Sequence, residues 1–389
     1  MDWMISNMRA TALTLAKTQL TSLVLAVLIC LISFTSWLSD QPQTAFDQLA
    51  LGKDVTEVSQ QEEGYHVHCR TLNDGGQCLH DWLERGAKPV HVWLGNSQLH
   101  AINQWQPGET TAPNVLHQRW KDGNHTLLAY SQPNANLMEH YLLFEALLEK
   151  LPVERLILPV VFDDLRETGI RPTLLPLLSQ PSIVSNLSNT SIGQKIIAQN
   201  TQVEKQSEID LKGLSETPQK RVESYLNHQL SHYWPWWDKR VEARGQIYFF
   251  LYRLRNQVFG ITAQSKRKII RARYLDNMAA LDAILVRAKQ RFVDILLYIP
   301  PIRNDVELPY LMREYTSFKH SLSEKAQGPH IHLFNFENLV PAHWWGANNS
   351  TNMQDKTELD FMHFQGPGHV RLAQAIDEAV KTMDKGVSR

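Results

Sequence analysis

Short apolar runs, each long enough for one buried strand, recur along the chain and constrain its fold more than any other feature. The run from Leu156 to Phe162 does not alternate with polar residues, which is typical of a strand covered by helices on both faces. Helical spacing of apolar residues appears at 136–150 and again at about 368–383. Strands that alternate with helices predict an α/β fold with a doubly wound parallel sheet. The expected strands are 89–94, 125–130, 155–162, 292–299 and 330–334.

The N-terminal region carries an uncharged segment, Thr18 to Ser39, that is almost wholly apolar from Leu20 onward. About twenty such residues in a helix cross the roughly 30 Å hydrocarbon layer of a membrane. Basic residues precede the segment and acidic residues follow it, so the positive-inside tendency predicts a cytoplasmic segment 1–17 and an outward-facing remainder. A cleaved signal peptide is the alternative, but no clear small-x-small cleavage site follows the segment. We therefore expect an uncleaved membrane anchor at 18–39.

The overall charge is almost balanced, with 39 basic and 40 acidic side chains among 389 residues and a formal net charge of −1. Binding to nucleic acid depends on a strong positive field, which this composition does not provide. We expect no nucleic-acid partner. With 43% hydrophobic residues, the chain can build a large core beyond the anchor, and we place the α/β domain at 88–389.

Two of the three cysteines, Cys69 and Cys78, flank a turn-rich segment in a region expected to be a membrane-proximal stalk at 40–87. In an oxidising compartment they would form a disulfide. Three histidines, His66, His68 and His80, surround the pair, so a metal site with thiolate ligands is the alternative. The spacing does not match a standard zinc site, and we expect the disulfide and no metal.

An insertion at about 186–290 separates the third and fourth expected strands and is far longer than a crossover requires. Residues 186–220 are polar and are expected to form a mobile loop, whereas the rest has the pattern of helices. Aromatic clusters at 233–237 and 247–252 lie beside basic residues. This combination suits either a membrane interface or a cap over the sheet.

A serine and a histidine-aspartate pair lie at opposite ends of the expected α/β domain. Ser97 follows a strand and Gly95, in the position of a strand-to-helix elbow that exposes a hydroxyl above a sheet. Asp360 precedes His363 by three residues, and a helix begins just behind them. That spacing lets a carboxylate fix one imidazole tautomer while the other ring nitrogen faces a pocket.

The segments Gly95-Asn-Ser-Gln98 and Asp360-Phe-Met-His363 resemble the first and last conserved blocks of the SGNH (GDSL-like) hydrolase superfamily. The resemblance implies a Ser97 nucleophile, a His363 base and an Asp360 that orients the base. The chain departs from the family at Asn96, where Asp is common. At the second and third blocks, Asn134 and Asp163 stand where the family supplies oxyanion donors.

An ionised aspartate accepts hydrogen bonds and cannot donate them, so Asp163 would instead orient another group or contact substrate. Asn134 could still present its backbone amide, because asparagine tolerates a positive φ. Gln98 completes the candidate oxyanion and substrate residues, since it directly follows the serine.

The predicted anchor and large insertion resemble membrane-tethered SGNH members, such as D-alanyl-lipoteichoic-acid transfer proteins and O-acetyltransferases of alginate-like polysaccharides. The resemblance implies acyl transfer to a cell-envelope or secreted polysaccharide in the periplasm. It also implies a membrane-bound O-acyltransferase as partner, and neither a metal nor an organic cofactor. The alternatives are an esterase or deacetylase of envelope glycans, and an inactive scaffold that binds the membrane-bound acyltransferase.

Overall fold

The computed structural model describes residues 54–58, 61–62, 65–69, 72–199, 240–348, 351–354 and 356–387. Nearly all of them belong to one compact unit, formed by residues 51–212 and 252–389. The described part of the other unit is residues 240–251, within helix α9 (Arg240–Val258). The predicted cytoplasmic segment 1–17 and anchor 18–39 lie outside the described residues. Within the ranges given above, no helix combines the length and apolarity needed to cross a membrane.

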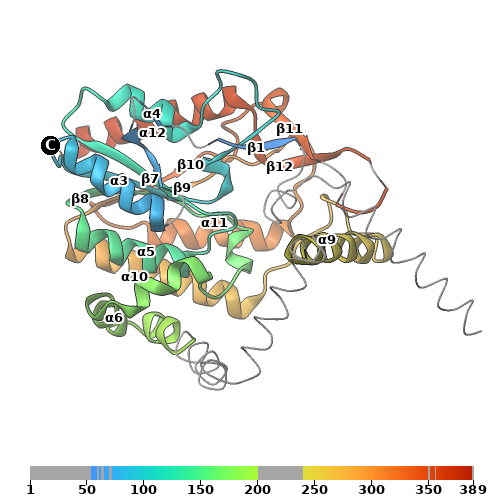
Figure 1. Cartoon of the computed structure of the whole chain (residues 1–389), viewed down its shortest axis with the longest axis horizontal. Coiled ribbons are helices and arrows are strands. Elements are labelled where there is room, and N and C mark those ends of the chain that lie inside the picture. Colours follow the sequence, from blue (N-terminus) through green and yellow to red (C-terminus); the bar gives the residue numbers. More distant parts are fainter. Residues whose placement is uncertain are drawn as a thin grey trace, which may run out of the picture. The chain divides into compact units, whose positions relative to one another are not determined.

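Six parallel strands form the central sheet, in the order β10-β9-β8-β5-β7-β4 (Figure 1). Because all six run in the same direction, their carboxyl ends meet at one edge of the sheet. The prediction of an α/β fold with a parallel sheet is confirmed, with one strand more than expected. The strands are β4 (His68–Cys69), β5 (Val90–Gly95), β7 (Thr126–Ser131), β8 (Val153–Pro159), β9 (Asp294–Ile299) and β10 (Ile331–Asn335).

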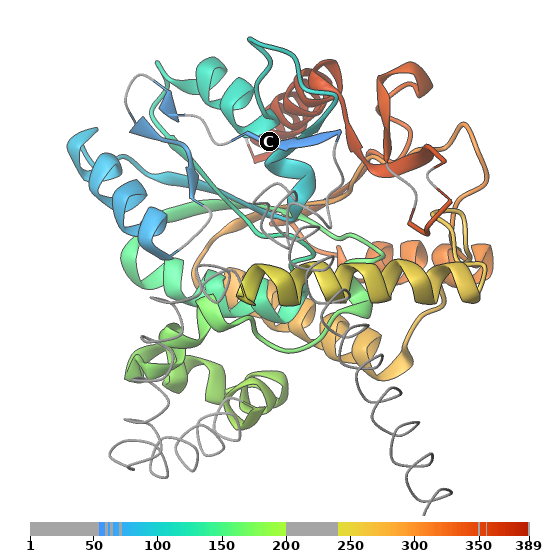
Figure 2. The same cartoon turned by 45° about the vertical axis from the view of Figure 1, so that its right-hand side comes forward.

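Helices cover both faces of this sheet (Figures 1 and 2). Successive side chains of a strand point to opposite faces, so Val92 and Leu94 join one apolar cluster and Trp93 joins the other. Helices α4 (Ala112–Trp120) and α12 (Gly366–Val387) cover the face of Trp93. The opposite face is covered by α3 (Leu72–Glu84), α5 (Leu137–Lys150), α6 (Pro181–Ser188), α10 (Arg271–Gln290) and α11 (Met312–Lys325).

Short elements beside the sheet carry the residues of the candidate site, which come from distant parts of the sequence. Strand β12 (Glu358–Phe364) pairs with β11 (Trp345–Asn348), and β6 (Ala101–Asn103) pairs with β1 (Val55–Glu57), both antiparallel. The packing of β12 against β6 and against the 3-10 helix η1 (Ser97–Leu99) brings the end of the chain to the serine. The remaining elements are β2 (Gln61–Glu62), β3 (Tyr65–His66), η2 (Asp164–Arg166), η3 (Pro172–Ser179) and η5 (Ala342–Trp344).

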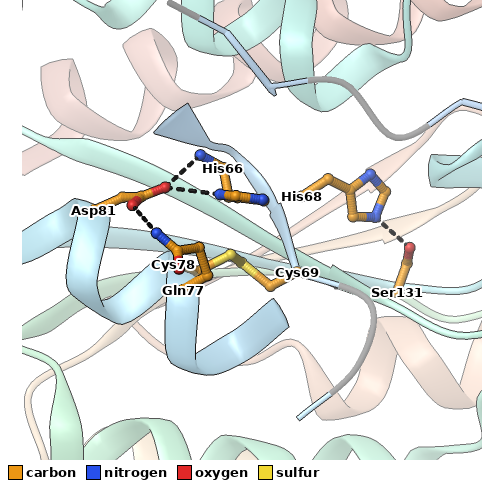
Figure 3. Close-up of a disulfide and its surroundings, with 7 residues drawn as sticks. All are labelled: His66, His68, Cys69, Gln77, Cys78, Asp81 and Ser131. Atoms are coloured by element: carbon orange, nitrogen blue, oxygen red, sulfur yellow. Dashed lines mark hydrogen bonds and ion pairs between the residues drawn. A yellow bond between two sulfur atoms is a disulfide. The ribbon is translucent and has the colours of Figure 1, made fainter. Parts of the chain in front are cut away.

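The segment expected to be a stalk contributes to the domain. Strand β4 pairs with β7 at the edge of the sheet, and the segment expected to be turn-rich is mostly the helix α3. A buried disulfide joins Cys69 in β4 to Cys78 in α3 (Figure 3). The sequence did not predict this helix, because it contains glycines at 75 and 76 and glycine lowers helix propensity.

The three histidines beside the cysteines have other partners. His66 contacts the carboxylate of Asp81, His68 contacts the hydroxyl of Ser131 (Figure 3), and His80 pairs with Glu84 on the surface. Both sulfur atoms are used in the disulfide, so neither is available as a thiolate ligand.

The predicted insertion contains part of the core. Helix α10 packs against α5 and η2 and leads directly into β9, so it is the crossover helix of the sheet. Residues 191–199 are helical, so the expected mobile loop at 186–220 does not begin where the sequence suggested. The aromatic cluster at 233–237 lies outside the described residues.

We predict that the disulfide stabilises this edge of the sheet by about 2–3 kcal/mol, because it closes a short loop and restricts the unfolded chain. The double variant Cys69→Ala/Cys78→Ala should unfold at lower urea concentration than the wild type by that free energy. Reductant should shift the wild-type midpoint and leave the variant unchanged. A wild-type midpoint that does not respond to reductant would contradict the prediction.

Candidate active site

Ser97 stands at a sharp turn where β5 ends and η1 begins. Asn96 caps this short helix, since its side-chain Oδ1 accepts the Gln98 backbone N–H at 3.0 Å. A side chain at Gly95 would meet Leu99 at 2.4 Å, so glycine allows the chain to turn closely over the end of the strand. The Ser97 N–H belongs to the first turn of η1, where backbone N–H groups have no partner within the helix.

The structure brings the three residues of the predicted triad together. Ser97 Oγ lies 2.9 Å from His363 Nε2, and His363 Nδ1 lies 3.0 Å from Asp360 Oδ2. All three are buried, with exposed fractions of 5% for Ser97, 9% for His363 and 5% for Asp360. Because Nδ1 faces a carboxylate, the neutral ring carries its proton there, and Nε2 accepts the hydrogen of the serine hydroxyl.

The carboxylate of Asp360 receives four hydrogen bonds. Its Oδ1 accepts the backbone N–H groups of Met362 and His363 at 2.8 and 2.9 Å, and its Oδ2 also accepts from Asn103 Nδ2 at 3.0 Å. Burial by itself would raise the pKa of Asp360. The charge and hydrogen bonds of His363, with the Met362 N–H, outweigh burial and hold that pKa below its ordinary value. Asp360 therefore stays ionised behind the imidazole.

Asn103 lies in the neighbouring strand β6 and donates a hydrogen bond to Asp360. This role was not predicted from the sequence. The Asn103 side chain is fully buried and also donates to the carbonyl of Ala347 at 3.0 Å. A Cβ on Gly346 would lie 1.9 Å from Asn103 Cγ, so only glycine leaves room for this amide. No local motif marks Asn103, because the contact depends on residues about 250 positions away.

Gln98 has a different place from the one expected. Its side chain donates to the carbonyl of Pro301 at 2.9 Å and to that of Met362 at 2.8 Å. Both amide hydrogens are used, so this side chain joins the end of β9 to β12 and offers no N–H to a substrate. The expected role of Gln98 as an oxyanion donor does not fit these contacts, since its backbone N–H donates to Asn96.

Of the two adjacent aspartates after β8, Asp164 contacts the residue before the serine and Asp163 has other partners. The carboxylate of Asp163 accepts from Arg267 and from the Tyr310 hydroxyl. Asp164 instead accepts from Asn96 Nδ2 at 2.8 Å, and its burial raises its pKa well above the ordinary value. Sequence alone cannot decide which of two consecutive acids points inward at a turn.

Asn134 does adopt a positive φ of 50°, in the turn between β7 and α5. The Gln132 N–H donates to the Gly95 carbonyl at 3.2 Å, so this turn is tied to the strand that carries the serine. The Asn134 side chain is exposed, and among the described residues no hydrogen bond links it to Ser97. Its predicted amide donor therefore stays a prediction.

Ser131, at the end of β7, is a second buried serine near this edge. Its hydroxyl lies 2.5 Å from His68 Nε2 and 2.6 Å from His100 Nδ1. His68 is one of the three histidines that the alternative to the disulfide would have used as metal ligands. A hydroxyl between two rings joins β4 and β7 to the segment that follows Ser97.

No family model matches the sequence, and no curated protein matches it. Among solved structures, the chain is similar to the crystal structure of a Bacteroides fragilis protein that is described, provisionally, as an acylhydrolase. The two share 11% sequence identity with a TM-score of 0.34, over 78% of this chain and 97% of the other. A likeness at this level carries no argument about function, which depends on the geometry of the site.

We predict that Asn103→Ala destabilises the fold by about 1–3 kcal/mol near neutral pH, because a buried carboxylate loses one of its donors. The pKa of Asp360 is lower in the folded state, so its ionised form stabilises the fold above the unfolded pKa of about 4. That contribution is lost as the pH falls through the folded-state pKa. The loss of unfolding free energy caused by Asn103→Ala should therefore become smaller in acid, as measured by urea unfolding at several pH values.

The matched control is the same substitution in an Asp360→Asn background, where no carboxylate is present and the pH-dependent part of the deficit should disappear. Gly346→Ala should reproduce the effect of Asn103→Ala, because it displaces the same amide. A deficit that is constant with pH would show that Asn103 fills space without stabilising the charge.

Proposed function

We propose that the protein is a membrane-anchored serine acyltransferase of the SGNH type, which transfers an acyl group such as acetyl to an envelope or secreted polysaccharide. One observation carries the proposal: the Ser97 hydroxyl lies 2.9 Å from His363 Nε2, and Asp360 lies 3.0 Å behind the ring. A hydroxyl, a base and an orienting carboxylate in this order activate a serine for attack on a carbonyl.

The first half of the reaction forms an acyl-enzyme. His363 Nε2 removes the proton as Ser97 Oγ attacks the carbonyl carbon of an ester or thioester donor. The imidazolium that results is stabilised by the ionised Asp360. As the tetrahedral intermediate collapses, the bond to the leaving group breaks, and His363 gives its proton to that group.

The second half of the reaction uses the same base. A sugar hydroxyl gives its proton to His363 Nε2 and attacks the acyl carbon, and Ser97 leaves with the proton that His363 returns. If water takes the place of the sugar hydroxyl, the product is a free acid and the enzyme is an esterase. Transfer therefore requires an acceptor that is held in position more effectively than water.

The developing oxyanion needs donors at the serine turn. The Ser97 N–H is suited to this role, because it lies at the start of η1 and is not used by the cap, whereas the Gln98 N–H donates to Asn96. We infer a second donor from the turn that contains Asn134, which is tied to Gly95 at the same edge of the sheet. Each such donor typically contributes about 3 kcal/mol to transition-state stabilisation.

The location and partner are part of the proposal and come from the sequence. An anchor at 18–39 would hold the domain at the outer surface of a bacterial inner membrane, next to a membrane-bound O-acyltransferase. The disulfide between Cys69 and Cys78 supports an oxidising compartment, since such bonds persist there. Acyl transfer through a serine requires neither a metal nor an organic cofactor.

We predict that a fluorophosphonate probe labels the wild type and the control variant Ser323→Ala, which changes an exposed serine on α11. Ser97→Ala should not be labelled, since the attacking oxygen is absent. It should also lose hydrolysis of p-nitrophenyl acetate by several orders of magnitude, and Asp360→Asn should lose roughly 10²–10⁴-fold. The absence of labelling in correctly folded wild type would favour an inactive scaffold.

Competition between acceptors separates transfer from hydrolysis. With an acyl donor at fixed concentration, added glycan should divert product from the free acid to the acylated glycan, while total turnover stays constant or rises. This outcome follows because both acceptors react with one acyl-enzyme. A product that remains free acid at every glycan concentration would identify an esterase instead.

A further inference from the structure

A groove with a volume of about 590 Å³ opens beside the start of α12. One wall is the loop at 108–110, and the other consists of side chains from the first turns of α12. Trp344 of η5 also lines it. None of these residues belongs to the triad.

The groove begins close to the base. Gly366 lines it and follows His363 by three residues, and an extended chain covers at most about 3.6 Å per residue, so the two lie within about 11 Å. The carbonyl of Trp344 also accepts the Gln365 N–H at 2.8 Å, which fixes η5 against this connection. The Gly366 end of the groove is therefore within about 11 Å of His363 along the chain.

The groove is already formed in this structure. A Cβ on Gly366 would lie 2.4 Å from the carboxyl carbon of Glu109, so the loop and the helix start are in close contact. The loop is held by its own hydrogen bonds, since Glu109 Oε2 accepts the Gln106 N–H at 2.8 Å and the Glu109 carbonyl accepts from Trp105 Nε1 at 3.0 Å. A preformed site saves the entropy of ordering these groups on binding.

The lining combines an aromatic plane with polar groups. Trp344 is half-buried and Val370 is 40% exposed, so both present apolar surface to the groove. Arg371 and Gln374 line the groove from α12, and within the described ranges their side chains form no hydrogen bond. Sugar rings offer apolar C–H faces and a rim of hydroxyl groups, which match an aromatic plane flanked by planar donors and acceptors. A bare acyl chain would leave these polar groups unmatched.

We propose that this groove binds the saccharide acceptor and directs one of its hydroxyl groups toward His363. The proposal rests on the acyl-transfer function proposed above. A length of several sugar units would lie along α12, with Trp344 beneath one ring and Arg371 and Gln374 at its edge.

The test measures binding without turnover, by isothermal titration of the full chain carrying Ser97→Ala. The probes are hexasaccharides of glucose, of N-acetylglucosamine and of galacturonic acid. At least one should bind, and adding Trp344→Ala should weaken that binding by tenfold or more, whereas adding Arg371→Ala should weaken it several-fold. The matched control Arg313→Ala changes an exposed arginine on α11 and should leave the affinity unchanged.

A second variant guards against misfolding of Trp344→Ala. Val370→Trp adds bulk at an exposed position, should keep the thermal stability of the parent, and should block the groove. Binding of no probe, or binding that survives both Trp344→Ala and Val370→Trp, would overturn the proposal. Because this assay does not depend on catalysis and phosphonate labelling of Ser97 does not depend on the groove, failure of one proposal is distinguishable from failure of the other.

Discussion

Burial of both faces of one parallel sheet governs the arrangement of everything else in this domain. A strand that is covered on both sides must return through a helix to the same end of the sheet, so all carboxyl ends gather at one edge. The serine turn follows β5, and the Gln132 turn and the Asp164 turn follow β7 and β8. The Pro301 carbonyl follows β9. Residues far apart in sequence therefore meet without any strained or unusual backbone at the serine.

Three neutral amides then fix the distances within that edge. Asn96 joins the serine turn to Asp164, Gln98 joins it to Pro301 and Met362, and Asn103 joins β6 to Asp360. Ser97 and His363 are 266 residues apart, and these side chains explain how their contact is maintained. Amides suit the task, because they pair with carbonyls and carboxylates alike without adding charge to a buried site.

The sequence was informative where a pattern is local. Apolar runs identified five of the six strands of the sheet, and the Asp360–His363 spacing and the Gly95–Ser97 turn marked the three residues that the structure brings together. It was uninformative where a role depends on distant contacts, as for Asn103, or on the direction of one side chain, as for Asp163 and Asp164. Strand β4 was missed because two residues give no detectable period, and α3 because glycines interrupt it. The core position of α10 within the expected insertion was not predicted, because a buried crossover helix and a helical insertion have the same spacing.

The central claim is that His363 keeps its proton on Nδ1, toward Asp360, and presents a bare Nε2 to the Ser97 hydroxyl. Nitrogen NMR of the protein labelled with ¹⁵N-histidine tests this directly, with His363→Gln to assign the signals. For the neutral ring, the account predicts a protonated Nδ1 and an unprotonated Nε2 for this residue. A His363 ring that carries its proton on Nε2, or exchanges freely between the two tautomers, would contradict it.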